Sequence, residues 1–293
     1  MRAAGFALLG LILLSPYVLG GAMPRVVEGM APAPAAGNAA PAIAAHMVWG
    51  GGPVLHAPKV YLVFWGWGSA ANPLPADPAG EAPVLAAFFA GIGGSSWLES
   101  QTQYTDAAGH VGNQANQLGG VWWDNRTEPL TIPDEWIATE ANYAASHFGY
   151  PQDAVYFIAL PHLHNNAEFG PGGYCAYHSA TTAGTRTIAY VDFPYIPDSD
   201  NFLVSSCGDN FVNSGAAGNL DGVTIVAGHE YAEAVTDPVP NTGWNDPSNG
   251  ETGDICAWIS SGQGAMQDIT LSTGKFAVQS LWSNSANACV QSG

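Results

Sequence analysis

The fold is decided by the stretch Thr224-Ile225-Val226-Ala227-Gly228-His229-Glu230-Tyr231-Ala232-Glu233-Ala234-Val235, in which ionisable side chains interrupt an otherwise apolar run. We predict that residues 221–235 form a helix. Asp237-Pro238 should end this helix, because the residue before a proline disfavours the helical region. Ionisable groups in so apolar a helix are costly to bury unless they are paired or ligated. The helix is therefore expected to carry a buried functional site.

The spacing within this helix places two side chains of metal-ligand type on one face. His229 and Glu233 are four residues apart, so they lie about one turn from each other and can reach one ion. Glu230 is rotated from that face by about 100°. In the HExxH helix of zinc peptidases, this arrangement supplies two ligands and, from the intervening glutamate, a general base. With Glu233 in place of the second histidine, the motif is HExxE, which suits Zn²⁺ but also harder divalent cations such as manganese or calcium.

A third metal ligand is expected from the chain that follows the helix. Glu251, Asp254 and Asp237 are the candidates, and spacing alone does not rank them firmly. We favour Asp254 slightly, because a disulfide at Cys256 would anchor it. A neighbouring carboxylate that does not ligate the ion can orient the ligand histidine through its other ring nitrogen.

The chemistry expected from these residues is metal-assisted hydrolysis. Glu230 would remove a proton from water and later return it to the leaving amine. Tyr231 or His178 would stabilise the developing oxyanion. We therefore expect a metal-dependent peptidase, with two alternatives left open: a non-catalytic extracellular binding protein for cell-wall carbohydrate, and a glycoside hydrolase. In the first alternative, His229 and the acids hold a structural ion or none.

Outside this helix, the sequence predicts further strands and helices. Runs rich in β-branched and aromatic residues predict strands at 59–65, 154–160, 187–193 and 276–282. Helical spacing of apolar residues predicts helices at 81–92 and 133–147. We expect an α+β fold, a single domain in which a mixed β-sheet packs against helices, with residues 221–235 as a zincin-like active-site helix.

The N-terminal region has the composition of an export signal followed by a spacer. Residues 1–22 combine Arg2, a short apolar core and small residues, which is typical of a signal peptide. Residues 23–45 are rich in alanine, proline and glycine and are expected to be a linker or a short pro-segment, so the domain would span 46–293. The apolar core is too short to cross a bilayer. We expect a secreted protein, extracellular or periplasmic, with no membrane insertion after signal cleavage.

The cysteines agree with export. The chain has four, and an even number in an exported protein is typical of disulfides. We expect the sequential pairing Cys175–Cys207 and Cys256–Cys289, because each bond closes a local loop. A cysteine-bound zinc is the rival interpretation, although the sequence has no CxxC pair.

The charge balance excludes some partners. Six lysines and arginines stand against 24 aspartates and glutamates, so the chain has little with which to neutralise phosphates. We therefore expect neither nucleic acid nor anionic membranes as partners. We expect a polypeptide substrate and a monomeric protein.

Several short motifs, taken in order, resemble the phosphate-induced protein 1 (EXORDIUM-like) family and its bacterial secreted relatives over roughly residues 59–260. The motifs are Val60–Gly66, Phe88-Phe89, Ser96-Trp97, Gln103-Tyr104, Cys175–His178, Ala234–Pro238, Gly243-Trp244 and Glu251–Cys256. The resemblance implies an extracellular location and a shared fold. Plant members of the family are tied to growth signalling and many lack the His-Glu pair, whereas bacterial relatives carry it at the matching place. The resemblance thus implies the scaffold and does not by itself imply an activity.

Overall fold

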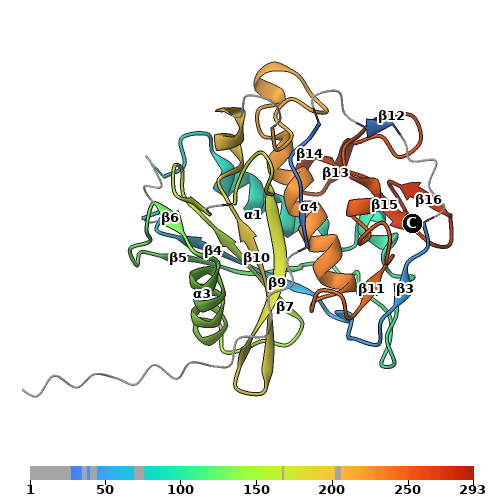
Figure 1. The fold of residues 1–293 in the computed structure, drawn as a ribbon, viewed down its shortest axis with the longest axis horizontal. Coiled ribbons are helices and arrows are strands. Elements are labelled where there is room, and N and C mark those ends of the chain that lie inside the picture. The colour runs from blue at the N-terminus through green and yellow to red at the C-terminus, as the bar shows by residue number, and fades with distance from the viewer. Residues whose placement is uncertain (1–27, 35–37, 40–44, 69–75, 167, 202–205) are drawn as a thin grey trace, which may run out of the picture.

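A six-stranded mixed β-sheet forms the centre of the computed structural model (Figure 1). The structure describes residues 28–34, 38–39, 45–68, 76–166, 168–201 and 206–293, so the expected signal peptide lies outside the described residues. In order across the sheet, the strands are β1 (Glu28–Met30), β9 (Ala176–Ala183), β10 (Arg186–Phe193), β7 (Ala154–Ala159), β4 (Lys59–Trp65) and β5 (Leu118–Asp124). The strands from β10 to β5 pair in parallel, whereas β9 and β1 pair antiparallel with their neighbours.

Helices cover both faces of this sheet, which confirms the predicted α+β class. The major helices are α1 (Glu81–Ile92), α3 (Asp134–His147) and α4 (Asp221–Thr236). Side chains alternate between the faces of a strand, so in β4 Leu62 and Phe64 belong to one core and Val63 and Trp65 to the other. The first core includes apolar residues of α1 and α4, and the second includes those of α3. The sheet therefore lies between α3 on one side and α1 with α4 on the other.

Shorter elements complete the fold. They are α2 (Ser96–Glu99), β2 (Asn38–Ala39), β3 (Val48–Trp49), β6 (Thr131–Ile132), β8 (Asn165–Asn166), β11 (Trp244–Asn245), β12 (Ile259–Ser261), β13 (Gln267–Leu271), β14 (Gly274–Val278), β15 (Leu281–Ser283), β16 (Ala288–Val290) and the 3₁₀ turns η1 (Ile196–Asn201), η2 (Gly215–Ala217) and η3 (Asp254–Cys256). Hairpins β13–β14 and β15–β16 form the C-terminal part of the chain, and β14 packs on α4.

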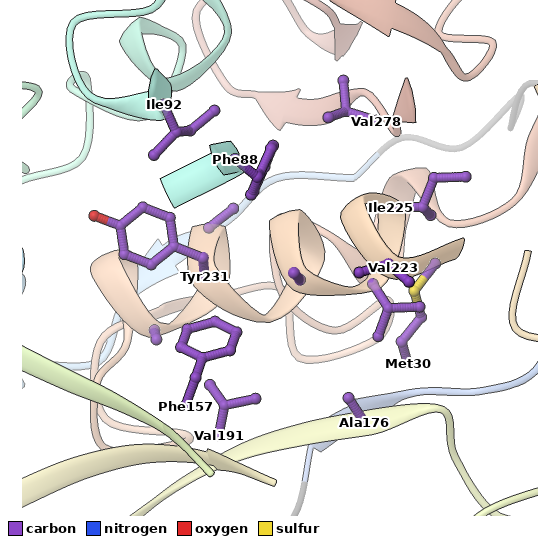
Figure 2. Close-up of a cluster of buried hydrophobic side chains, with 14 of the residues drawn as sticks. Met30, Phe88, Ile92, Phe157, Ala176, Val191, Val223, Ile225, Tyr231 and Val278 are labelled. Atoms are coloured by element: carbon purple, nitrogen blue, oxygen red, sulfur yellow. The ribbon is translucent and has the colours of Figure 1, made fainter. Parts of the chain in front are cut away.

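Helix α4 is buried along its whole length. Figure 2 shows Phe157 and Val191 of the sheet on one side of α4 and Phe88 of α1 on the other. At Gly228 an added Cβ would lie 3.3 Å from the Trp97 ring, so glycine lets this aromatic side chain pack close to the helix. Because no face of α4 is exposed, its ionisable side chains lie inside the protein.

The predicted strand at 276–282 is divided into β14 and β15. The break falls at Gln279 and Ser280, which are both fully buried. The side chains of these two residues hydrogen-bond to other segments: Gln279 Nε2 donates to the carbonyl of Gly253, and Ser280 Oγ donates to the carbonyl of Gly264. The predicted strand is therefore interrupted at two residues whose polar side chains hydrogen-bond to neighbouring loops.

Both expected disulfides are present. Cys175 bonds to Cys207 and Cys256 to Cys289, and the described residues contain no free cysteine, which excludes a cysteine-bound zinc there. Among the helices of the described residues, none is long and apolar enough to cross a membrane.

Part of the segment expected to be a linker or pro-segment belongs to the folded structure. Residues 28–34 and 38–39 are described; β1 pairs with β9, and β2 pairs with β12. Met30 is fully buried and Ala33 is 5% exposed. We predicted a spacer because the segment is rich in small residues. Small residues are also compatible with a strand that packs tightly at the edge of a sheet. The ordered fold therefore begins upstream of the expected boundary at residue 46.

Candidate metal centre

Helix α4 brings His229 and Glu233 together, as the i,i+4 spacing predicts. His229 Nε2 lies 3.1 Å from Glu233 Oε1, and both side chains are completely buried. The third member comes from η3, where Asp254 Oδ1 lies 3.6 Å from His229 Nε2. One ligand atom from each of His229, Glu233 and Asp254 lies within 4.8 Å of the others. We call this group the first triad, and it contains the ligand that the sequence slightly favoured.

A second triad shares Glu233 with the first. It consists of His178, Glu230 and Glu233, again with ligand atoms within 4.8 Å of one another. His178 lies on β9, and its Nδ1 is 3.6 Å from Glu230 Oε2 and 3.5 Å from Glu233 Oε2. Glu233 thus presents Oε1 to His229 and Oε2 to His178. Glu251 extends the group, because its Oε2 lies 3.3 Å from His178 Nε2.

These residues form one buried cluster, which we define as His178, His229, Glu230, Glu233, Glu251 and Asp254. All except Asp254 are completely buried, and the Asp254 side chain is 28% exposed. Neither of two cavities of about 420 and 540 Å³ is lined by a member of the cluster. The cluster thus lies outside these two cavities, and Asp254 is its one partly exposed member.

Electrostatics within the cluster hold both histidines in the charged form. Burial lowers the pKa of His229, but the carboxylates of Glu233 and its neighbours outweigh this effect and raise the pKa to about 10. Burial likewise lowers the pKa of His178, but Glu251 and the other adjacent carboxylates raise it well above its usual value. At neutral pH and without a metal ion, both imidazoles therefore carry a proton that a cation would replace.

The pKa values of the carboxyl groups in the cluster are shifted in opposite directions. Burial tends to raise the pKa of Glu233, yet the two histidines lower it to about 2. Burial, followed by the charge of Glu233, raises the pKa of Asp254 to about 7. Burial also raises the pKa of Glu230. Glu233 is thus charged at neutral pH, whereas burial makes both Glu230 and Asp254 more ready to accept a proton than an exposed carboxylate.

Several polar atoms of the cluster have no hydrogen-bond partner among the described residues. They are both ring nitrogens of His178, Nε2 of His229, and Oε2 of Glu230 and Glu233. Without an ion these atoms meet the other members of the cluster, in contacts of 3.1–3.6 Å between the histidine nitrogens and the carboxylates, and a bound cation would satisfy them more fully. One imidazole nitrogen with two carboxylate oxygens is a donor set that Zn²⁺ and harder divalent cations accept. The residues of the first triad therefore fit a divalent cation.

Residues beyond the ligands orient the first triad. Gln279 Oε1 lies 3.1 Å from Nδ1 of His229, and the Gln279 amide donates to the carbonyl of Gly253. The backbone N–H of Asp254 donates to Glu233 Oε1. Gln279 was not predicted, because its role depends on the break between β14 and β15, for which the sequence carries no signal that we recognise.

Two of the residues singled out in the sequence lie outside the cluster. The Tyr231 hydroxyl donates to Gln117 Oε1, so the structure does not bring it to the metal ligands. Asp237 accepts hydrogen bonds from the backbone of Thr242 and Gly243 and interacts with the side chain of Glu251. Asp237 therefore contacts the cluster through Glu251 and is not part of either triad.

Comparisons with protein-family models, with characterised proteins and with solved structures gave no match. The resemblance to the EXORDIUM-like family accordingly stays a prediction.

Proposed function

We propose that this protein is a secreted, metal-dependent peptidase with a zincin-like active-site helix. The observation that carries the proposal is the first triad, with Glu230 directly beside it on α4. The two disulfides are compatible with secretion, because such bonds persist in oxidising compartments.

His229, Glu233 and Asp254 would hold the ion, and Zn²⁺ is our first choice. The chemistry that a divalent cation would supply here is polarisation of the scissile carbonyl and a lower pKa of bound water. Glu230 would act as the general base, since burial raises the pKa of its carboxyl group above the usual value and makes the carboxylate a better proton acceptor. His178 lies 3.6 Å from Glu230 and would stabilise negative charge on the substrate oxygen. Tyr231 does not fit this role, because its hydroxyl donates to Gln117.

The decisive experiment combines metal analysis with a cleavage assay on an unfolded protein such as casein. Wild-type protein should contain bound metal and show cleavage that a chelator abolishes. Glu230→Gln should keep the metal and lower cleavage by about 10²- to 10⁴-fold, because general base catalysis contributes on that order. Glu135→Gln, the same change at an exposed position of α3, should leave both properties unchanged.

The burial of every member of the cluster except Asp254 favours a second candidate function. In that case the protein is a non-catalytic extracellular binding protein of the EXORDIUM type, and the cluster holds a structural ion. Bound metal without chelator-sensitive cleavage, in the wild-type protein and in a form with an opened site, would support this candidate against the peptidase. Loss of metal from Glu230→Gln would instead show that Glu230 is a ligand.

A further inference from the structure

Strand β1 pairs with the edge of β9 that faces away from β10, directly beside the cluster. The two strands are antiparallel, and Glu28, Gly29 and Met30 pair with His178, Tyr177 and Ala176. Figure 1 shows the blue N-terminal segment between β9 and α4, and β1 contacts both elements. The partner of Glu28 in this pairing is therefore the histidine of the second triad.

The segment is held mainly through its backbone. The N–H of Met30 donates to Glu230 Oε1 at 3.2 Å, and its carbonyl accepts from Cys175 at 2.6 Å. Beyond β1, the carbonyl of Ala31 accepts from the Trp258 ring at 2.7 Å. Any extended polypeptide offers the same N–H and carbonyl groups, and pairing of this kind with a sheet edge is a recurrent mode of peptide recognition.

The atoms along this edge of β9 limit which residues can occupy the positions of β1. At Gly29 an added Cβ would lie 2.4 Å from the carbonyl oxygen of Ala176 and 2.7 Å from Cβ of Tyr177, so only glycine fits. The next side chain, Met30, is fully buried, and Figure 2 shows it between Ala176 of β9 and Val223 of α4. The edge thus accepts a glycine followed by a long apolar residue.

The position of β1 also contributes to the burial of Glu230. Glu230 is completely buried, and one of its carboxylate oxygens accepts the backbone N–H of Met30. A polypeptide that lay in the same place would bring its backbone to the residue we propose as the general base.

We infer that the edge of β9 facing α4 is a binding groove for an extended polypeptide with a glycine and a following apolar residue, and that residues 28–34 fill this groove as an occluding segment. The catalytic consequence rests on the proposed function, because displacement of the segment would admit a substrate to Glu230. The groove itself depends only on the pairing of β1 with β9 and on the fit at Gly29 and Met30.

The first test is Gly29→Val, which should dislodge β1. A labelled peptide with the sequence of residues 28–34, Glu-Gly-Met-Ala-Pro-Ala-Pro, should bind this variant and bind wild-type protein at least tenfold more weakly, since the groove is filled there. Chelator-sensitive cleavage of casein should rise at least tenfold. Gly109→Ala is the matched control, because an added Cβ at Gly109 meets nothing closer than 3.6 Å; it should behave as wild type.

The second test keeps the wild-type groove and does not depend on the folding of a variant. A specific protease site is inserted between residues 34 and 38, and the folded full-length chain is cut there and dialysed. Release of the N-terminal fragment should open the groove to the labelled peptide, and re-addition of excess unlabelled peptide should close it.

The possible outcomes separate the two proposals. Peptide binding to the opened protein without chelator-sensitive cleavage would support the groove and overturn the peptidase. Equal cleavage by the closed and opened proteins, with no peptide binding to either, would overturn the groove and leave the peptidase standing. An opened protein that is folded by circular dichroism but binds no peptide would likewise overturn the groove.

Discussion

Glu233 connects the two histidines of the cluster, with one carboxylate oxygen directed to each. Its proposed role as a ligand makes it more important for metal binding than His178, which belongs to the second triad alone. Glu233→Gln should therefore lose the metal on dialysis, whereas His178→Gln should keep one ion per chain. Metal content measured by mass spectrometry checks this, and two ions in wild type with one in His178→Gln would show that both triads bind metal.

Metal binding should release protons. Because the pKa of His229 is about 10 without a metal ion, its imidazole is charged at neutral pH and must lose a proton to become a ligand. We expect at least one proton released per ion at pH 7, and an affinity that falls about tenfold per pH unit as the pH is lowered. Calorimetry in buffers of different ionisation enthalpy measures this release, and a heat independent of the buffer would contradict it.

Gly253 packs closely against two of the proposed metal ligands. An added Cβ there would lie 2.7 Å from Glu233 Oε1 and 2.7 Å from His229 Nδ1. Its φ of −78° is open to any residue, so the effect of Gly253→Ala is steric and not conformational. We expect this variant to lose metal affinity by at least tenfold, as measured by chelator competition, with a melting temperature close to that of the apo wild type.

Whether a residue of the cluster could be predicted from the sequence depends on whether its contacts lie within one element or join distant ones. His229, Glu230 and Glu233 were predictable, because the helical period alone places them together. His178 was named, but its position beside Glu230 was not, since that depends on the packing of β9 against α4. Asp254 came from its proximity to Cys256, and the disulfide expected there is present.

Among the elements, the loop at Asp106 is organised by one carboxylate. Asp106 accepts hydrogen bonds from the backbone of Val54, Ala108 and Gly109, and it pairs with His56. Burial tends to raise the pKa of Asp106, but these partners prevail and lower it from 3.8 to about 2. A carboxyl group whose pKa is lower in the folded state stabilises the fold above its unfolded pKa, and this contribution is lost as the pH falls through the folded pKa.

Asp106→Asn should therefore lower the melting temperature most at pH 5 and above. The difference from wild type should shrink between about pH 4 and pH 2, where the wild-type carboxylate becomes protonated. Thermal unfolding followed by circular dichroism over this pH range measures the effect. A difference that stays constant from pH 6 to pH 2 would show that the charge of Asp106 is not its source.

The elements that were predicted best are those with a clear local sequence pattern, either a helical period or an unbroken apolar run. Helix α1 has the predicted bounds, and β4, a continuous apolar run, also has them. Strand β9 was not predicted, because its residues are mostly small or polar, and β1 was assigned to a spacer for the same reason. Both are strands through their pairing with each other and, for β9, with β10, which a local pattern does not reveal.

At the scale of the whole molecule, the disulfide Cys256–Cys289 joins the loop that carries Asp254 to the C-terminal hairpin. Closing a loop with a sequence separation of 33 residues is expected to contribute about 3–4 kcal/mol to stability. Replacing both cysteines with serine should lower the melting temperature and weaken metal binding, because Asp254 is two residues from the bond.

The other disulfide provides a matched control for this prediction. Cys175–Cys207 has a sequence separation of 32, so its removal should destabilise the fold by a similar amount. Its effect on metal affinity should be smaller, because neither cysteine adjoins a residue of the first triad. Equal losses of metal affinity in both double variants would show that Asp254 is not positioned by its neighbouring bond.

The hydrogen bond between Met30 and Glu230 joins residues that are 200 positions apart. A chain synthesised from its N-terminus makes β1 first, yet the partners of β1 on β9 and α4 follow only in the second half of the sequence. Contacts of such long range form slowly, because the entropy of closing the loop must be overcome before the pairing is gained. We therefore expect Glu230 to be buried under β1 late in folding, and a nascent chain interrupted before α4 contains neither the proposed groove nor the proposed centre.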